Sequence, residues 1–273
     1  MDGGWKDYYQ CRVIEDRTWL IRDLYGDYCY LLEGEESALL IDAGIGLPGF
    51  EEAIRQLTDK QVRVLLTHGH LDHIGGCGYW QEVLIHEKEI STFGMHQNAG
   101  YRQIIRGLTE EVGLKLKEEA VKSCINIKIP QKINFIKEKD VEQEIDLGGR
   151  RLIIIETPGH TEGSVCLWEP ERETLYSGDT ICENRVMLSF PESCSAKCYY
   201  TSLNKLAAIQ DKIQKIYAGH NRIPISPAWI GHFMDCAAAL AGNQNMGRMK
   251  ETNSVFGKCQ IFKVGIAELT CHI

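Results

Sequence analysis

Hydrophobic and polar positions in the first third of the chain predict short strands that give way to alternating strands and helices. Near the N-terminus, β-branched and aromatic residues form short runs that are separated by turn residues such as Gly26. A helix is predicted over residues 50–57, because Ile54 and Leu57 lie three positions apart on one helical face. The pattern favours a mixed, layered α/β arrangement over a pure β-sandwich. The runs predicted to be strands here are residues 18–22, 27–33, 37–41 and 63–66.

A polar and helical stretch then interrupts the strands, from residue 86 to about residue 121. Further helices are predicted over residues 202–210 and over residues 226 to about 249. The chain shows no internal repeat and no low-complexity linker, so we expect one domain of residues 1–273. That domain would carry a helical insertion at about 86–130 and a C-terminal extension of a helix plus strand at about 226–273. The later runs predicted to be strands are residues 133–136, 144–147, 151–156, 164–168, 174–176 and 213–218, with one or two more between 259 and 273.

Composition and charge narrow the class of protein. Hydrophobic residues make up 44% of the 273 residues and charged residues 25%, which is typical of a globular protein. No run approaches the roughly 18 apolar residues of a membrane span, and the start of the chain lacks the apolar region of a secretory signal. The net charge of −8 argues against a nucleic-acid partner. The eleven cysteines are odd in number and scattered, so we expect reduced thiols and a cytoplasmic protein.

The strongest chemical signal follows the predicted strand at residues 63–66, where the sequence reads HGHLDH. His68 and His70 are two positions apart, so on an extended segment they point the same way and could share one cation. Asp72 and His73 follow, next to a pair of glycines where the chain is expected to turn, and they would point toward a second cation. Imidazole and carboxylate groups suit Zn²⁺, Fe²⁺ or Mn²⁺. A solvated polar loop is the alternative, which so dense a group of ligands disfavours.

Three later loops offer the additional ligands that such a metal site needs. Each loop contains a glycine and follows a predicted strand, and their candidate ligands are His160, Asp179 and His220. Each signal is weak alone, since a histidine after a glycine is usually a surface residue. The repetition of a strand followed by a ligand is the stronger observation, because ligands on strand-end loops converge on one edge of a sheet.

From about residue 27 to residue 220, the order of these motifs resembles the metallo-β-lactamase-fold superfamily of metallo-hydrolases. The resemblance implies an α+β fold, an αββα sandwich in which two mixed β-sheets pack face to face with helices outside. It also implies a binuclear metal site in the cleft between the sheets. One metal would be held by His68, His70 and His160, and the other by Asp72, His73 and His220, with Asp179 bridging both.

Asp42, in the segment IDAG, resembles an early acid of the family that supports the metal-binding loop from behind the ligands. An acid at a turn or a helix entry is the alternative for this residue. The most familiar metallo-β-lactamases have a cysteine at the position of Asp179. An aspartate there is similar to hydroxyacylglutathione hydrolases, lactonases, ribonuclease Z and related thioesterases.

The remaining choice lies among hydrolases of thioesters, lactones and phosphodiesters. Members that process RNA or DNA normally add large domains or a basic exosite, for which 273 residues and a charge of −8 leave little room. Lactonases of the quorum-signal type carry a tyrosine shortly after the bridging acid. Here Thr180, Ile181 and Cys182 follow Asp179, which disfavours a lactone substrate.

We therefore expect a hydrolase in which a hydroxide between two divalent metals, zinc or alternatively iron or manganese, attacks a small-molecule thioester or activated ester. Asp72 is the expected catalytic side chain, since it could bind metal, orient the hydroxide and carry its proton. The motifs contain no side chain that is clearly a general acid, which favours a thiolate leaving group. A lactonase or phosphodiesterase of the same fold is one alternative. A non-catalytic metal- or ligand-binding regulatory protein is another.

Substrate-binding residues are not identified by the sequence. Arg248 and Lys250 on the predicted C-terminal helix could meet an anionic substrate tail, although charges at a helix end more often interact with the helix dipole. The helical insertion could be a lid, a pocket wall, a surface decoration or a contact in a homodimer.

Overall fold

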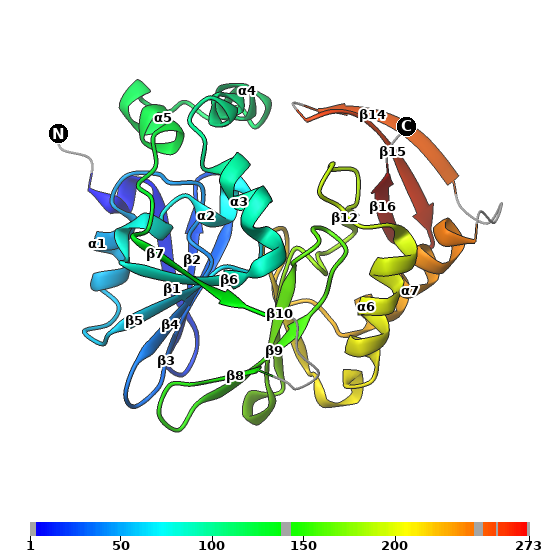
Figure 1. Ribbon diagram of the computed structural model, residues 1–273, viewed down its shortest axis with the longest axis horizontal. Helices are drawn as coiled ribbons and strands as arrows, with labels where there is room; N and C mark the ends of the chain where they lie inside the picture. The colour runs from blue at the N-terminus through cyan, green and yellow to red at the C-terminus, as the bar shows by residue number, and fades with distance from the viewer. Residues whose placement is uncertain (1–3, 138–142, 243–247, 255, 272–273) are drawn as a thin grey trace. The chain divides into compact units, whose positions relative to one another are not determined.

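The computed structural model describes residues 4–137, 143–242, 248–254 and 256–271 (Figure 1). The chain divides into two compact units, of which unit 1 comprises Met1–Lys137 with Asp146–Arg150 and unit 2 comprises Glu138–Ile145 with Arg151–Ile273. Unit 1 contains one sheet and unit 2 contains two, and each unit has its own hydrophobic core. The expectation of a single domain stays a prediction.

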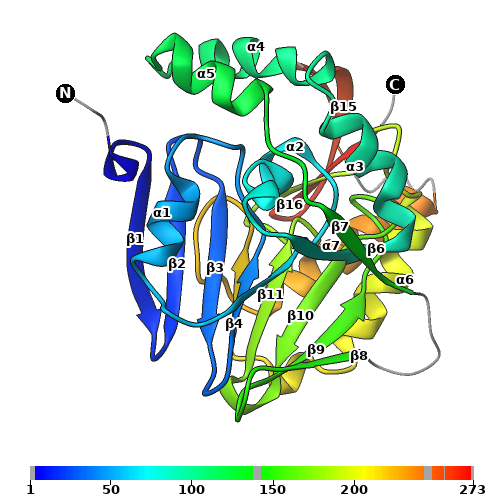
Figure 2. The same cartoon turned by 60° about the vertical axis from the view of Figure 1, so that its left-hand side comes forward.

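Unit 1 is built on one seven-stranded sheet in which the strands follow one another in chain order (Figure 2). The first four strands form an antiparallel meander, and the last three run parallel to the fourth. The sequence predicted five of these strands within a few residues and missed β1 and β6. The strands are β1 (Tyr9–Glu15), β2 (Thr18–Asp23), β3 (Tyr28–Glu33), β4 (Ala38–Ile41), β5 (Val62–Leu65), β6 (Glu82–His86) and β7 (Lys132–Ile136).

Helices cover one face of this sheet and close the core of unit 1. Alternate strand residues such as Leu31 and Leu40 pack against helix residues such as Phe50 and Phe93, because successive side chains of a strand point to opposite faces. The predicted helical insertion is the crossover between the parallel strands β6 and β7, and it contains three of the helices. The helices are α1 (Phe50–Arg55), α2 (Leu71–Ile74), α3 (Ile90–His96), α4 (Ile104–Glu111) and α5 (Glu118–Ile125).

Unit 2 contains a five-stranded sheet in the order β13-β11-β10-β9-β8 and a four-stranded sheet in the order β12-β16-β15-β14. Helices α6 (Ala196–Ala207) and α7 (Ala228–Ala241) lie side by side in both views (Figures 1 and 2), and their buried faces supply Leu203 and Phe233 to the core. The strands are β8 (Gln143–Asp146), β9 (Arg151–Glu156), β10 (Val165–Glu169), β11 (Thr174–Gly178), β12 (Arg185–Met187), β13 (Lys215–Ala218), β14 (Arg248–Ser254), β15 (Gly257–Val264) and β16 (Ala267–Cys271).

The sequence-based prediction of the C-terminal helix is wrong at its end. The helix ends at Ala241, and Lys250 lies in β14, where it pairs with Ile261 of the antiparallel strand β15. Gly242 directly follows the last residue of the helix. Strand β14 forms because it pairs with β15, and the helix and strand propensities of its own residues do not predict that pairing. Lys250 is therefore not at a helix end, and the side chain of Arg248 lies outside the described residues.

The predicted α+β class is confirmed, since mixed sheets and separate helices make up both units. The predicted helix over residues 202–210 begins earlier, at Ala196, where the hydroxyl of Ser195 accepts a hydrogen bond from the backbone N–H of Cys198. None of the helices in the described ranges is both long enough and apolar enough to cross a bilayer.

Candidate metal centre

In unit 1, the predicted ligands His68, His70, Asp72 and His73 form what we call the loop cluster. They lie on the loop that leaves β5 and on the helix α2, with His70 at the N-cap of that helix. The Nε2 atom of His68 lies 3.1 Å from Nδ1 of His70, and the ring of His68 is 4.0 Å from that of His73 between centroids. The three histidines are buried, so the loop brings their rings together away from solvent.

Asp42 holds the loop cluster from one side. It follows β4, which pairs in parallel with β5, so Asp42 and Thr67 emerge at the same edge of the sheet. Its carboxylate accepts a hydrogen bond from the backbone N–H of Thr67 at 2.7 Å and one from Nδ1 of His73 at 2.9 Å. Because the carboxylate accepts the Nδ1 proton, His73 keeps a lone pair on Nε2 for a metal. The carboxylate of Asp42 thus contacts His73 directly, and its role in supporting a metal ligand stays a prediction.

Glycine allows the loop after Asp42 to approach the end of α2. A Cβ atom on Gly75 would lie 2.1 Å from the carbonyl carbon of Ile45, which is far inside van der Waals contact. The N–H of Gly75 donates to the carbonyl of Gly44, and the N–H of Gly76 donates to that of Ala43. The two segments are therefore fixed to each other through backbone atoms, and Gly75 is required for that contact.

In unit 2, the predicted ligands His160, Asp179 and His220 form what we call the strand-end cluster. They follow β9, β11 and β13, respectively. Since β10 pairs antiparallel with both β9 and β11, and β11 pairs parallel with β13, the three strands run in the same direction. Their carboxyl ends meet at one edge of the sheet, and the three ligands meet there with them.

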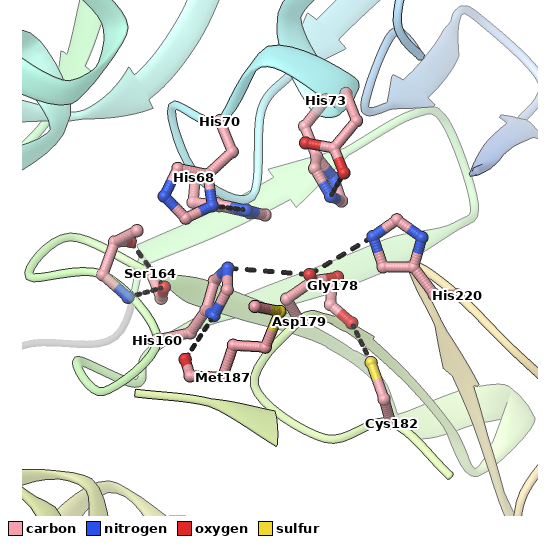
Figure 3. A network of polar contacts seen from close by, with 12 residues as sticks. His68, His70, His73, His160, Ser164, Gly178, Asp179, Cys182, Met187 and His220 are labelled. Atoms are coloured by element: carbon pink, nitrogen blue, oxygen red, sulfur yellow. Dashed lines mark hydrogen bonds and ion pairs between the residues drawn. The ribbon is translucent and has the colours of Figure 1, made fainter. Parts of the chain in front are cut away.

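A single carboxylate oxygen lies between the two imidazoles of the strand-end cluster. Figure 3 shows Asp179 with His160 on one side and His220 on the other. The Oδ2 atom of Asp179 is 3.2 Å from Nε2 of His220 and 3.6 Å from Nε2 of His160. The Nδ1 atom of His160 donates to the carbonyl oxygen of Met187 at 2.7 Å, because a carbonyl can only accept. Nε2 of His160 faces Asp179, and in the neutral ring this atom carries the lone pair that a metal could use.

The loops that carry the strand-end cluster rest on Tyr199 of helix α6. The Tyr199 hydroxyl donates to the carbonyl oxygen of Thr180 at 2.7 Å, directly after Asp179. A Cβ atom on Gly159, directly before His160, would lie 2.4 Å from the Tyr199 ring. Tyr199 is buried, and its burial raises the pKa of its hydroxyl well above the ordinary value. Its role is to pack the two ligand-bearing loops against the helix.

The donor sets fit a divalent transition metal. Two ligands bound to one tetrahedral zinc, at 2.0–2.1 Å each, are about 3.3 Å apart. Three pairs come close to that separation, namely His68 with His70, His160 with Asp179, and His220 with Asp179. Asp72 lies farther from its neighbour, with Oδ2 at 3.9 Å from Nε2 of His73. Imidazole nitrogens and carboxylate oxygens are suitable for zinc, iron and manganese.

Cys182 is close to the strand-end cluster without resembling a ligand. Its Sγ atom lies 3.8 Å from the carbonyl oxygen of Gly178. Burial, followed by the charge of Asp179, raises the pKa of the thiol, so at neutral pH the sulfur keeps its proton. Among the described residues, the groups of three candidate ligand atoms do not include this sulfur, and we describe Cys182 as a packing residue.

Some neighbours of the clusters had no signal in the sequence. The Phe190 ring meets the His160 ring edge-on, with centroids 5.7 Å apart, and Phe256 meets Phe190 at 5.3 Å. In unit 1, Glu89 and His96 contact the backbone of the loop that carries the loop cluster, although nothing in the sequence distinguishes His96 from an ordinary histidine. Only an alignment or a structure could have identified them, since their positions follow from the packing of the insertion.

Comparison with known proteins agrees with the resemblance read from the motifs. The model of the metallo-beta-lactamase superfamily matches residues 22–220, which include both clusters. The chain is 28% identical over 204 residues to the acyl-coenzyme A thioesterase MBLAC2 of Gallus gallus, covering 70% of this chain and 71% of that protein. It is 28% identical over 211 residues to a hydroxyacylglutathione hydrolase of Pelagibacter ubique (strain HTCC1062), covering 74% of this chain and 69% of that enzyme.

The fold is similar to that of solved structures in the same superfamily. A metallo-beta-lactamase from Pontibacter korlensis aligns with a TM-score of 0.57 at 16% sequence identity, covering 84% of this chain and 99% of that one. At that identity the similarity concerns the fold alone. The fold, the matched segment and the ligand motifs agree, and the chain belongs to the metallo-β-lactamase superfamily of metallo-hydrolases.

Proposed function

We propose that this protein is a binuclear metal-dependent hydrolase that cleaves a small-molecule acyl thioester. The observation that carries the proposal is the position of Asp179, whose Oδ2 atom contacts both His160 and His220. The resemblance assigns these histidines to different metals, so a shared carboxylate oxygen is what a bridging ligand requires. In the proposed site, as the resemblance implies, His68, His70 and His160 would hold one ion, Asp72, His73 and His220 would hold the other, and Asp179 would be shared by both.

Two divalent cations, proposed to be zinc with iron or manganese as alternatives, would supply an activated water and polarise the carbonyl of the substrate. The protein's part is to fix the ligands. Asp42 and the carbonyl of Met187 hold the Nδ1 protons of His73 and His160, so both rings present Nε2. Asp72 is the more exposed of the two proposed acidic ligands, with 29% of its side chain accessible against 14% for Asp179. We assign it the orientation of the attacking water and the acceptance of its proton.

The choice of a thioester rests on chemistry and on the relatives. A thiolate leaves without being protonated, which suits a site whose motifs include no clear general acid. One relative is named an acyl-coenzyme A thioesterase and another a hydroxyacylglutathione hydrolase. Phe190, beside His160, offers an apolar contact for an acyl group. A lactonase or phosphodiesterase with the same site is the second candidate, since its metal ligands would be the same.

An assay of metal-loaded protein tests the proposal. The purified chain is loaded separately with zinc, iron and manganese and assayed on an acyl-coenzyme A thioester, a lactone and bis(p-nitrophenyl) phosphate. We expect close to two metal ions per chain and the highest kcat/KM on the thioester. Turnover confined to the phosphodiester would contradict the thioester assignment. Less than one bound metal per chain would instead favour a non-catalytic binding or regulatory protein.

The proposed partners and location rest on the sequence alone. The substrate is proposed to be a small molecule, with neither nucleic acid nor membrane as a partner, because the net charge is −8. A cytoplasmic location is proposed from the odd, scattered cysteines.

A further inference from the structure

Three buried side chains of the helical insertion contact the backbone of the loop cluster. Glu89 ends a 3₁₀ turn after β6, His96 ends α3, and Arg102 lies in the 3₁₀ turn Tyr101–Gln103. Each is at most 1% exposed, which is unusual for charged and polar side chains. Because buried polar groups must be satisfied, their partners show what these residues hold in place.

Glu89 and His96 bind the backbone on either side of His70. An Oε2 atom of Glu89 accepts a hydrogen bond from the N–H of Gly69 at 2.7 Å. The Nδ1 atom of His96 accepts one from the N–H of Leu71 at 3.1 Å. The peptide groups before and after this metal ligand are therefore both anchored to the insertion rather than to the sheet.

The insertion also lies directly against the loop between His68 and His70. A Cβ atom on Gly69 would be 2.7 Å from the backbone nitrogen of Phe93 in α3 and 3.1 Å from Oε2 of Glu89. Only a glycine fits at that distance. Since α3 packs against the residue that separates the two histidines, its position affects the spacing of their ring nitrogens.

Arg102 connects the loop cluster to the rest of the insertion. Its guanidinium donates to the carbonyl oxygens of Leu71 and His96, each at 3.0 Å, and to those of Ile45 and Cys124. Four chain segments thus meet at one side chain. Burial lowers the pKa of Arg102 to about 10, so the group still carries its charge at neutral pH. A buried cation that is held by carbonyl groups adds little net stability, because its desolvation offsets its hydrogen bonds.

We propose that Arg102 is a positioning residue for the metal centre and that the insertion acts as a brace for the metal-binding loop. The brace consists of Glu89, His96 and Arg102, which fix Gly69 and Leu71 and thereby orient the histidine between them. The inference rests on the proposed function in one respect only, that the loop cluster binds metal. From the sequence, the insertion could be a lid, a pocket wall, a surface decoration or a dimer contact. The brace assigns it a different role, the support of the metal-binding loop.

Direct titration of metal tests the brace without relying on turnover. Zinc dissociation constants are measured with a chromophoric chelator for the wild-type full chain and for Arg102→Met and Arg102→Lys. We expect Arg102→Met to weaken zinc binding by about 10- to 100-fold, the range found when groups that orient metal ligands are removed. Arg102→Lys should recover part of the loss, because lysine keeps the charge but forms fewer of the four hydrogen bonds.

Arg150 provides a matched control in the same unit. It is also buried, at 6% exposure, and it donates to the carbonyl of Arg17 at 2.8 Å and to the hydroxyl of Thr18 at 2.9 Å. Neither partner belongs to the loop cluster. Arg150→Lys should lower thermal stability while leaving zinc affinity within twofold of wild type, which separates positioning from general stabilisation.

A second pair of variants is available if Arg102→Met does not fold. In His96→Asn, the amide oxygen can replace Nδ1 as the acceptor for the N–H of Leu71, whereas His96→Leu removes the acceptor. We expect zinc affinity close to wild type in the first and at least tenfold weaker binding in the second. Equal affinity in Arg102→Lys, His96→Leu and wild type would overturn the brace. A wild-type chain that binds no zinc, iron or manganese would instead overturn the proposed function, and the brace with it.

Discussion

The two ligand clusters are organised by different parts of the backbone. The loop cluster places its four ligands within a single short segment and depends on side chains for support, most directly on Asp42 behind His73. The strand-end cluster takes its ligands from three separate loops, and the group behind His160 is a backbone carbonyl, that of Met187. The first cluster is therefore local in sequence but relies on distant side chains for its geometry. The second is dispersed in sequence, yet the sheet determines its geometry.

This difference determines what mutations can change. The directions of β9, β11 and β13 put their ends at one edge, and hydrogen bonds of the sheet maintain that arrangement whatever the side chains are. The support of the loop cluster can be removed one side chain at a time. Substitutions of the supporting side chains should thus lower the metal affinity of the loop cluster step by step. The metal affinity of the strand-end cluster should fall mainly when one of its ligands is itself replaced.

The largest effect is expected from Asp179→Ala, which removes the oxygen between His160 and His220. If Asp179 bridges two metals, metal content and turnover should fall together, with kcat/KM reduced by about a thousandfold or more, since metal catalysis contributes several kcal/mol. Metal analysis and thioester turnover of the variant measure both quantities. The exposed Asp211 in the same unit is the control, and Asp211→Ala should match wild type. Full activity in Asp179→Ala would refute the bridging role.

The second prediction concerns the backbone contact of the loop cluster. In Gly75→Ala, the new methyl group would meet the carbonyl carbon of Ile45, which cannot move without displacing the segment after Asp42. We expect a loss of about 3 kcal/mol in the free energy of unfolding, within the range for overpacked sites. Denaturant titration by circular dichroism measures it. Gly94, in helix α3, has open space around its Cα, so Gly94→Ala should be neutral or stabilising by up to about 1 kcal/mol.

The same contrast explains how much the sequence could predict. The ligands of the loop cluster were recognisable because they lie within one motif, and strands such as β9 were recognisable because four of its six residues form a continuous apolar run. The ligands of the strand-end cluster were individually weak, and became convincing only through the repeated order of strand and ligand. Within each unit, the candidate ligands lie close together and directly after the ends of strands that the sequence predicted.

Other features lay beyond local patterns. Strand β1 carried only a short signal, since YQCRV alternates apolar and polar residues over five positions, and as an edge strand it buries little of its surface. Strand β14 contains few strand-forming residues and depends on its partner β15. Arg102 had no signal at all, because its four carbonyl partners are distributed over distant segments. Contacts of this kind are set by tertiary packing, which a single sequence does not display.

The third prediction tests the dependence of the loop cluster on its side-chain support. In wild type, the two carboxylate oxygens of Asp42 accept hydrogen bonds from the N–H of Thr67 and from Nδ1 of His73. In Asp42→Asn, the amide oxygen can accept only one of these two bonds, because the NH₂ group is a donor and cannot accept the second. We expect metal affinity to fall by about 10- to 100-fold. Competition with a chelator measures the change. The equivalent support of His160 is a backbone carbonyl, which a side-chain substitution does not remove. An unaltered metal affinity in Asp42→Asn would therefore show that the loop cluster does not depend on side-chain support more than the strand-end cluster does.

At neutral pH, the smallest effect is expected from two buried thiols, Cys166 in unit 2 and Cys77 in unit 1. Burial raises the pKa of Cys166, whose sulfur contacts Thr157 in unit 2, to about 11, and that of Cys77, which follows Gly76 in unit 1, to about 12. The folded pKa is above the unfolded value of about 8.5 in both, so the contribution to stability is complete below that pH. It is lost as the pH rises, because only the unfolded thiol ionises.

Each thiol should therefore reduce the free energy of unfolding by about 1.4 kcal/mol per pH unit above pH 9, until its folded pKa is reached. Cys166→Ala should flatten the pH dependence between pH 9 and 11, and Cys77→Ala should flatten it up to pH 12. Urea titrations across this range measure the slopes, with Cys198→Ala at a partly exposed position as the control. Below pH 10 both thiols keep their protons in the folded state, so the two slopes should be equal; the loss due to Cys166 should level off first, near pH 11, and that due to Cys77 only near pH 12.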